Sequence, residues 1–306
     1  MKNLTLTIMK NLTQYIEKYP HRTQSIFGIN FEQLNRLIEM LKQIEAERQA
    51  ADKSSGINPK GAGRHPKLGI DEQIYLCLFY LRHHLTFAVL GLIFEVSEST
   101  AQSIFEFWVQ QLRDSLPASL WEQYLDDEVG WEIVTEILEQ QRLIVDSTEQ
   151  RRERPQDDQA QQQHYSGKKK QHTLKSQVVA TDDGDDIVDV IAGVPGPSAD
   201  INLLRQQQTR LSAAQGFLGD KAYQGAARTK TPHKKPRGRE LPCEKVAENR
   251  ETSAQRIFVE HLIGKIKLFR VMQERFRLRP EKYETIFLTI CGLVRLRLGR
   301  IDFELL

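Results

Sequence analysis

The sequence predicts a protein in two parts: an all-α N-terminal region followed by an α+β or α/β domain built on a mixed sheet. Three observations support this fold class. Apolar residues recur at helical spacing up to about residue 112, an apolar, mostly β-branched run occupies residues 143–145, and a second short apolar run occupies residues 216–219. Steps of three and four favour helices, whereas continuous apolar runs favour strands buried on both faces. The chain should therefore change character near residue 141.

Length and composition limit the classes of protein to which the chain can belong. Its 306 residues suggest about two domains, and 40% hydrophobic with 27% charged residues is typical of globular proteins. The three scattered cysteines form no C-x-x-C pair, which argues against a disulfide framework or a cysteine zinc site and favours a reducing cytoplasm. No signal peptide and no apolar run of about 18 residues is visible, so we expect neither export nor a membrane span.

The charges are unevenly distributed, although the formal net charge is only +2. Residues 221–245 contain eight Lys or Arg against two Glu, and residues 256–300 contain eleven against four. Residues 122–139, by contrast, contain no basic residue at all. This asymmetry indicates a polyanionic partner for the C-terminal half of the chain.

The N-terminal region is predicted to be a series of helices. Apolar spacing predicts an amphipathic helix near residues 27–41 and further helices over 70–81, 86–96 and 101–112, the last capped by residues 97–100. Helix, short turn and capped helix is the helix-turn-helix layout, although a plain helical hairpin has the same pattern. The composition of the preceding segment, residues 51–67, predicts a flexible basic arm, which favours DNA binding, although a solvated loop has the same composition. The expected DNA contacts are Arg64, Lys67, Ser99, Thr100 and Gln102.

An acidic connector, helical near residues 132–138, is expected between the helical region and the sheet. After residue 141 we expect strands and helices in the order β-β-β-α-β-loop-α-α. The expected positions are strands over 172–180, 187–192 and 216–219, a helix over 198–206, a basic loop to about 249, and helices over about 252–272 and 281–298. The predicted domains are residues 1–115, a connector over 116–140, and a sheet domain over 141–300.

Three carboxylates stand out as candidates for chemistry. Asp146 and Asp220 each follow a buried strand, where a charge is costly unless it is paired or holds a cation. Glu260 shares one helical stripe with Arg256 and Lys267, within about 40° of each other. A surface ladder of ion pairs would explain any one of these acids. Three acids in one chain favour a site for Mg²⁺, which prefers oxygen ligands.

With these motifs, the chain resembles the DDE transposases of bacterial insertion sequences, specifically the insertion-sequence-five type with an N-terminal helix-turn-helix. The matching motifs are residues 143–149 around Asp146, residues 219–225 around Asp220, the basic loop 231–238, and the spacing of Arg256, Glu260 and Lys267. Members of this family often carry a tyrosine three residues before the arginine, where this chain has Ser253. The resemblance spans about residues 28–300 and implies an RNase H-like catalytic domain.

The resemblance also implies a mechanism and a set of site residues. Asp146, Asp220 and Glu260 would be the catalytic residues and would hold two Mg²⁺ ions, for which Mn²⁺ would substitute. Metal-activated water would nick the transposon ends, and the freed 3′-hydroxyl would attack target DNA in line, without a covalent protein–DNA intermediate. The residues expected to bind DNA phosphates are Lys168, Lys169, Lys170, Lys234, Lys235, Arg237, Arg256 and Lys267.

The implied partners are the terminal inverted repeats of the transposon and the target DNA. A homo-oligomer assembled on DNA is expected, with no membrane association, at the nucleoid in the bacterial cytoplasm.

Three alternative functions remain open on the sequence. The first is an inactive or domesticated transposase that only binds DNA, against which the intact acidic triad argues. The second is an RNase H-like nuclease without strand transfer, which only a joining assay separates. The third is a structural helical protein, which the strand-end aspartates disfavour.

Overall fold

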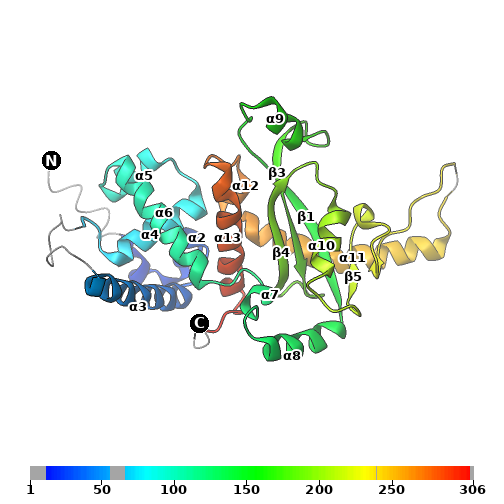
Figure 1. Ribbon diagram of the computed structural model, residues 1–306, viewed down its shortest axis with the longest axis horizontal. Helices are drawn as coiled ribbons and strands as arrows, with labels where there is room; N and C mark the ends of the chain where they lie inside the picture. The colour runs from blue at the N-terminus through cyan, green and yellow to red at the C-terminus, as the bar shows by residue number, and fades with distance from the viewer. Residues whose placement is uncertain (1–11, 56–65, 239, 304–306) are drawn as a thin grey trace.

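The computed structural model describes residues 12–55, 66–238 and 240–303 (Figure 1). A helical region occupies one end of the molecule, and a sheet covered by helices occupies the other. Between them lies α13 (Tyr283–Arg297), which contacts both α6 (Glu98–Ser115) and β4 (Ile187–Pro195). The last long helix of the chain therefore joins the two regions. None of the helices in the described ranges is long and apolar enough to cross a membrane.

The helical region contains the predicted helix-turn-helix. Besides a helical segment over residues 12–18, its described helices are η1 (Pro20–Arg22), α2 (Thr23–Phe27), α3 (Phe31–Ser55), α4 (Ile70–His83), α5 (Phe87–Phe94) and α6. Ser97 caps α6, because its hydroxyl accepts a hydrogen bond of 3.1 Å from the Thr100 amide. Gly91 permits the tight turn after α5, since a Cβ there would lie 2.7 Å from the Val96 carbonyl oxygen. The predicted order of helix, turn and capped helix is confirmed.

Two helices connect this region to the sheet, α7 (Leu120–Gln123) and α8 (Glu128–Glu139). The second begins four residues earlier than the predicted 132–138, because Asp127 caps it by accepting a hydrogen bond of 3.0 Å from the Gly130 amide. Trp131, Val134 and Leu138 of α8 pack against the sheet domain. The acidic connector is thus a helix with one face docked on the sheet.

The sheet is mixed and has six strands. Besides β4, they are β1 (Arg142–Arg151), β2 (Tyr165–Ser166), β3 (Gln171–Ala180), β5 (Gly216–Leu218) and β6 (Thr229–Lys230). Antiparallel β3 flanks β1 on one side and parallel β5 flanks it on the other, with β6 beyond β5. Both β2 and β4 pair with β3. This order, with an antiparallel meander before the parallel strand, agrees with the predicted RNase H-like domain after a helix-turn-helix.

The central strand β1 is buried on both faces, as its apolar run predicts. Ile144 belongs to a core that α11 (Cys243–Lys267) covers and that continues through α13 into the helical region. Leu143 and Val145 belong to a second core, against α8 and α10 (Asp200–Gln208). Because side chains alternate along a strand, Asp146 lies on the α11 side and Ser147 on the α10 side.

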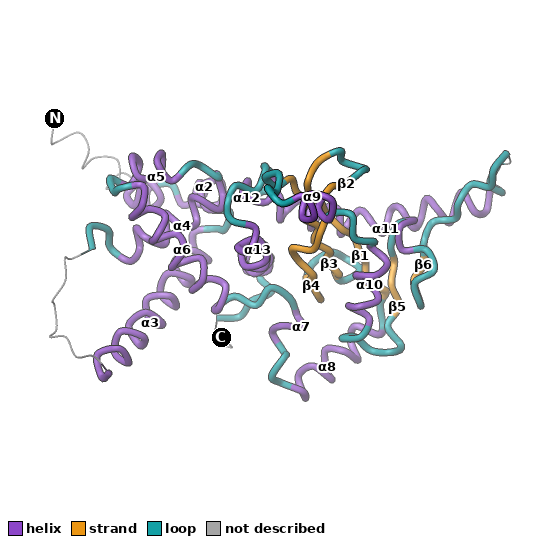
Figure 2. Tube along the Cα trace, turned by 45° about the horizontal axis from the view of Figure 1, so that its top comes forward, coloured by secondary structure: helices purple, strands orange, loops and turns teal. Residues whose placement is uncertain are grey.

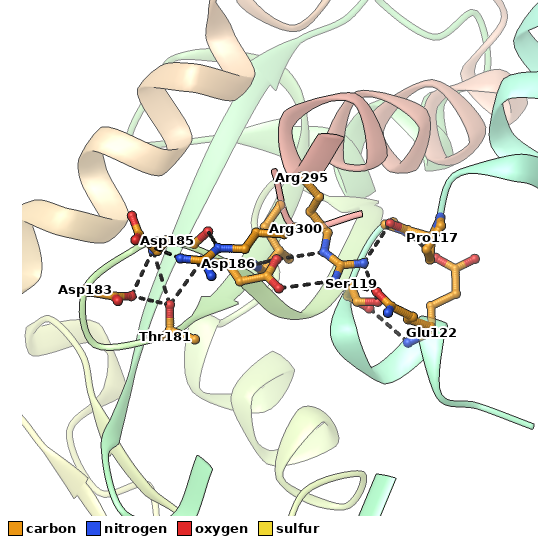
Figure 3. Close-up of polar contacts among 12 residues, drawn as sticks. Pro117, Ser119, Glu122, Thr181, Asp183, Asp185, Asp186, Arg295 and Arg300 are labelled. Atoms are coloured by element: carbon orange, nitrogen blue, oxygen red, sulfur yellow. Dashed lines mark hydrogen bonds and ion pairs between the residues drawn. The ribbon is translucent and has the colours of Figure 1, made fainter. Parts of the chain in front are cut away.

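A buried ion pair fixes the junction between the two regions. Arg295 of α13 is 0% exposed and donates to both carboxylate oxygens of Asp186, at 2.7 and 3.1 Å (Figure 3). Its remaining N–H groups donate to the Pro117 and Ser119 carbonyl oxygens, both at 3.1 Å, and to the Gln123 side chain at 2.8 Å. All five guanidinium donors are therefore bonded. One side chain ties the end of α6 and the start of α7 to the turn between β3 and β4.

Some predicted boundaries are wrong. β1 does not end at Asp146 but runs on to Arg151, because β3 pairs with it as far as Arg151 beside Thr173. The polar tract at 157–163 contains a helix, α9 (Asp158–His164), which Asp157 caps. Residues 243–249 belong to α11 rather than to a loop: α11 begins directly after Pro242. Helical spacing of apolar residues could not indicate this segment, because it projects beyond the core and is mostly exposed. The helix predicted over 252–272 also breaks in two, with α12 (Arg270–Gln273) after α11.

Candidate active site

The two aspartates occupy equivalent positions on neighbouring parallel strands. The pairing of β1 with β5 ends with Ile144 beside Leu218, and Asp146 and Asp220 each lie two residues further along. Since paired strands lie about 4.8 Å apart, this register brings both residues to the same place at the sheet edge. Asp146 thus lies within β1, and Asp220 lies just beyond the neighbouring strand β5, so the two strands are neighbours as the sequence predicted but β1 does not end at Asp146.

Asp220 is held by a tight turn immediately after β5. Its carboxylate accepts a hydrogen bond of 2.7 Å from the Ala222 amide and caps the short helix η2 (Lys221–Tyr223). Gly219 leaves room for the buried ring of Tyr223, because a Cβ on residue 219 would lie 2.6 Å from that ring. The sequence Gly-Asp-Lys-Ala-Tyr is therefore a local turn that fixes the position of Asp220.

Glu260 approaches from the helix that covers this face of the sheet. Its neighbours Val259, Leu262 and Ile263 are buried in the same core as Ile144, and α11 packs on β1. The Glu260 side chain is 55% exposed and forms an ion pair of 3.6 Å with Arg256. Arg256 is only 15% exposed, and its Nε atom is buried without a hydrogen-bond partner in the described part of the chain. Glu260 thus stands at the rim of the site, with a largely buried cation beside it.

The charge of Asp146 is poorly compensated. The pKa of its carboxyl is raised to about 6, mainly by burial, with the negative charges of Asp220 and Glu260 adding to the rise. A hydrogen bond of 2.9 Å from the Ser147 amide and the positive charge of Arg256 lower the pKa but do not cancel these effects. The three acids named by the sequence therefore share one electrostatic environment around Asp146.

The three carboxylates do not form a ready-made metal cage. Among the residues that the structure describes, no three acidic, histidine or cysteine side chains lie close enough together to hold a metal ion. The sequence-based expectation that all three converge within metal-bridging reach is therefore not met, and Glu260 pairs with Arg256 instead. The donor chemistry still suits a hard divalent cation, because the acids offer only oxygen ligands and a cation would relieve the repulsion on Asp146.

Two lysines lie near the acidic residues or near each other, one at the end of α11 and one in the turn between β2 and β3. The pKa of Lys267, at the end of α11, is lowered mainly by burial and also by the charge of Lys169, whereas Asp146 raises it. Lys169 lies in the exposed turn between β2 and β3, with Lys168 and Lys170 on either side. Of the predicted phosphate-binding residues, the structure therefore brings Arg256 and Lys267 close to the acids, and Lys169 close to Lys267.

The second basic loop lies elsewhere. Lys234, Lys235 and Arg237 are exposed in the loop after β6, and Lys235 forms a long ion pair of 3.9 Å with Glu240. This loop and the first half of α11 project together from the sheet, away from the helical region (Figures 1 and 2). The structure does not bring these three residues together with Asp146.

The predicted DNA contacts of the helix-turn-helix lie mostly on the first turn of α6. Ser99, Thr100 and Gln102 are exposed there. The hydroxyls of Ser99 and Thr100 lie 3.0 and 2.7 Å from the Ser97 hydroxyl, and Gln102 donates to Glu106 at 3.1 Å. Lys67 donates to the Glu95 carbonyl oxygen. Arg64 lies outside the described residues.

Sequence reasoning missed a polar cluster behind the aspartates. Ser147, Lys175, Asp200 and Tyr223 lie on the α10 side of the sheet, where Lys175 forms an ion pair of 2.9 Å with Asp200. The available signal was Lys175, a charged residue within an otherwise mostly uncharged strand over 172–180. Its partner could not be found from the sequence, because Asp200 lies 25 residues away at the start of a helix.

Comparison with known proteins agrees with this architecture. The model of a DDE superfamily endonuclease matches residues 145–295, and the model of the helix-turn-helix of that superfamily matches residues 66–118. A probable transposase for insertion sequence element IS702 from Microchaete diplosiphon is 28% identical over 281 residues, covering 89% of this chain and 92% of that protein. The crystal structure of a pre-cleavage Mos1 transpososome matches 76% of this chain and 88% of that chain, with 12% identity and a TM-score of 0.20, from which no shared geometry follows.

The two matched segments cover both parts of the chain in the order that the sequence motifs indicated. The helix-turn-helix match contains α4, α5 and α6, and the endonuclease match begins at the strand of Asp146 and extends into α13. The resemblance to DDE transposases of insertion sequences is therefore confirmed at the level of the family. The chain belongs to the DDE superfamily of endonucleases, as a member in which a helix-turn-helix precedes the endonuclease domain.

Proposed function

We propose that this protein is an active transposase that cuts DNA at the ends of an insertion sequence and joins the freed 3′ ends to target DNA, with Asp146, Asp220 and Glu260 as its catalytic carboxylates. One observation carries the proposal: the parallel register of β1 and β5 sets the two aspartates side by side, and Glu260 acts on Asp146 from α11. Family membership supports the same reaction class.

The three carboxylates would hold divalent cations, two Mg²⁺ ions in the proposed active state, with Mn²⁺ as a substitute. Ions held there would lower the pKa of water and would stabilise the attacking and leaving oxygens of an in-line phosphodiester displacement. For this, Glu260 must turn from Arg256 toward Asp146. The half-exposed Glu260 side chain is free to rotate at the rim, whereas the Ser147 and Ala222 amides already orient the two aspartates.

The cations around the acids would position the DNA backbone. Arg256 and Lys267 interact electrostatically with Asp146, and Lys169 with Lys267; these three cations would contact the phosphates next to the scissile bond. The buried Nε atom of Arg256 offers one donor that no described residue uses. Lys234, Lys235 and Arg237, on the projecting loop, would contact DNA further from the reacting phosphate.

End recognition is assigned to the helix-turn-helix. The exposed first turn of α6 would enter the major groove of the terminal inverted repeats, with Ser99, Thr100 and Gln102 toward the bases and Lys67 and Arg64 toward the backbone. Because a transposition event processes two ends, two copies of the chain would assemble on the DNA as a homo-oligomer. The reaction would take place at the nucleoid in the bacterial cytoplasm.

A cleavage and joining assay tests the proposal. Supercoiled plasmid carrying the native ends is incubated with Mg²⁺ or Mn²⁺ and with wild type, Asp146→Asn, Asp220→Asn or Glu260→Gln. Each amide keeps the shape of its side chain but removes its charge, so nicking should fall by a factor of about 1,000 or more, equivalent to at least about 4 kcal/mol of transition-state stabilisation. Binding to end DNA should remain.

The matched control is Glu251→Gln, an exposed glutamate on α11 away from the site, which should cut like wild type. Variants of the three acids that nick as fast as wild type would refute the assignment of these residues. If the wild-type protein nicks DNA but forms no joined products when target DNA is supplied, it is a nuclease without strand-transfer activity.

A further inference from the structure

A group of polar side chains lies behind the strand ends, on the sheet face opposite Asp146. Lys175 of β3 belongs to this group and is only 5% exposed. A buried ammonium is costly unless it is paired and hydrogen-bonded. Its Nζ atom lies 2.9 Å from Asp200 Oδ1 and also donates to the Ser198 carbonyl oxygen. The cation is therefore compensated by the first turn of α10, to which Asp200 belongs.

The same oxygen atom of Asp200 also accepts a hydrogen bond from the residue next to Asp146. The Ser147 hydroxyl donates to Asp200 Oδ1 at 2.8 Å, while the Ser147 amide donates to Asp146 Oδ1 at 2.9 Å. Ser147 thus carries two hydrogen bonds, one through each face of the sheet. One bond orients the Asp146 carboxylate, and the other anchors Ser147 to α10.

This anchor lies where β1 loses a neighbour. The pairing with β5 stops at Ile144 beside Leu218, so from Asp146 to Gln150 β3 is the only described strand that pairs with β1, before Phe276 bonds to Arg151 at the far end. A strand edge without a partner is more mobile than a paired one. The hydrogen bond from Ser147 to Asp200 holds β1 at this point, where no strand in the described part of the chain pairs with its other edge.

The loop of the second aspartate is anchored in the same cluster. The Tyr223 hydroxyl lies 3.0 Å from the side-chain amide of Gln177, which is the strand partner of Ser147. Burial raises the pKa of Tyr223, and the charges of Asp200, Asp146 and Asp220 raise it further, so this phenol stays protonated beside the acids. The strand ends that carry Asp146 and Asp220 therefore share one buried support.

From this geometry we infer that Ser147, Asp200 and Lys175 form a positioning relay: Lys175 neutralises and holds Asp200, Asp200 holds the Ser147 hydroxyl, and Ser147 orients the Asp146 carboxylate for cation binding. The inference rests on the proposed function, since it names the residues that prepare one of its catalytic carboxylates. None of the three touches the reacting atoms. Each acts through Asp146.

Substitution of Ser147 by Thr or by Val isolates the hydroxyl, because the two side chains have the same shape and only Thr can donate. We expect Ser147→Thr to retain nicking within about two-fold of wild type. Ser147→Val should lower the single-turnover nicking rate by about ten-fold, as residues that support metal ligands typically contribute about 10- to 100-fold. Affinity for end DNA should be the same for both variants.

A second readout needs neither DNA nor turnover. Mn²⁺ is titrated into the full chain, and its binding is followed by the loss of the electron paramagnetic resonance signal of the free ion, which gives the Mn²⁺ concentration at half-saturation (the Mn²⁺ midpoint). We expect this concentration to increase by about ten-fold in Ser147→Val and to stay near the wild-type value in Ser147→Thr. An unchanged Mn²⁺ midpoint in Ser147→Val would overturn the relay, as would an unchanged nicking rate.

A second matched pair decides the matter if Ser147→Val does not fold. Lys175→Met/Asp200→Asn and Lys175→Met/Asp200→Leu both remove the two buried charges, so their melting temperatures should be similar. Only Asn retains an oxygen that accepts from Ser147. The Asn variant should bind Mn²⁺ like wild type and the Leu variant about ten-fold more weakly, and equal Mn²⁺ midpoints would refute the relay.

These outcomes separate the relay from the proposed function. A wild-type chain that does not bind Mn²⁺, and which does not nick DNA, contradicts the proposed function. A wild-type chain that binds Mn²⁺ while all the variants match it contradicts the relay alone.

Discussion

The junction around Arg295 and the site around Asp146 both bury a charged side chain, but they compensate the charge to different extents. At the junction, the Arg295 guanidinium is 0% exposed and all five of its donors are bonded, two of them to Asp186. At the strand ends, Asp146 is largely buried beside two further acids, and its pKa rises to about 6. The first charge is fully compensated and the second is not.

The difference separates a structural role from a functional one. A buried pair with every hydrogen bond made resists separation, because loss of either partner leaves an unpaired charge in the interior. A carboxylate left with a raised pKa among other carboxylates is instead ready to accept a cation. The junction should therefore control stability, and the strand ends should control chemistry.

The largest expected effect on stability is at the junction. Arg295→Met leaves Asp186 buried without its partner and should lower the free energy of unfolding by about 3–5 kcal/mol, measured by chemical denaturation. Arg300→Met is the control, because Arg300 forms an exposed ion pair with Asp185 on the same turn, and it should cost less than about 1 kcal/mol. Equal losses of unfolding free energy in the two variants would show that the buried ion pair of Arg295 stabilises the fold no more than the exposed pair of Arg300.

The opposite sign is expected at the strand ends. In the absence of divalent cations, Asp146→Asn should raise the free energy of unfolding at pH 7.5 by on the order of 1–3 kcal/mol, because an amide does not suffer the penalty that raises the pKa from 3.8 to about 6. Denaturation in a chelating buffer measures this. A variant less stable than wild type would place Asp146 among the structural charges.

The pH dependence of that difference follows from the direction of the shift. Because the pKa of Asp146 is raised in the folded state, this carboxyl binds more protons in the folded state than in the unfolded one. Its contribution to wild-type stability therefore falls as pH rises from about 4 to about 6. The gain from Asp146→Asn should therefore be absent at pH 4, develop across this range and be complete above it. A difference that does not change with pH would exclude Asp146 as its source.

A smaller change is expected when the local cation is removed. The charge of Arg256 lowers the pKa of Asp146, so in Arg256→Gln this pKa should rise above the wild-type value. Carboxyl chemical shifts in a pH titration by NMR report it directly. Arg250→Gln, on the exposed part of the same helix, should leave the pKa of Asp146 unchanged. A fall in this pKa on loss of Arg256 would contradict the electrostatic picture of the site.

The smallest expected effect concerns DNA rather than the fold. Lys267→Gln should remove about one phosphate contact, so the slope of log affinity for end DNA against log salt concentration should become shallower by about 0.9. Fluorescence anisotropy between low and moderate NaCl measures the slope. Lys265→Gln, two residues earlier on α11, should keep the wild-type slope, and identical slopes for both variants and wild type would remove Lys267 from the DNA interface.

The predictions from sequence succeed where the determinant is local. The helix-turn-helix follows from apolar spacing and from Ser97, whose capping bond lies within one turn. The strand at 143–145 follows from its apolar run, and the glycine at 219 marks the turn that carries Asp220. These patterns suffice to place the two aspartates at neighbouring strands and to indicate the family.

The predictions fail where the determinant is a distant partner. β1 continues past Asp146 only because β3 pairs with it, and the sequence of β1 alone does not specify this. Likewise, the bond between Arg295 and Asp186 joins residues 109 apart, and the pair of Lys175 with Asp200 depends on how α10 packs on the sheet. The orientation of Glu260 has a local cause instead, because it pairs with Arg256 four residues earlier on the same helix.

The central claim is that Asp146, Asp220 and Glu260 act together as ligands of a divalent cation. Anomalous diffraction from a crystal of the full chain with end DNA and Mn²⁺ tests it directly. We expect anomalous density between the carboxylates of Asp146 and Asp220, with Glu260 turned away from Arg256 toward the ion. Density at another acidic surface, such as the turn containing Asp182, Asp183 and Asp185, with none beside Asp146, would contradict the claim.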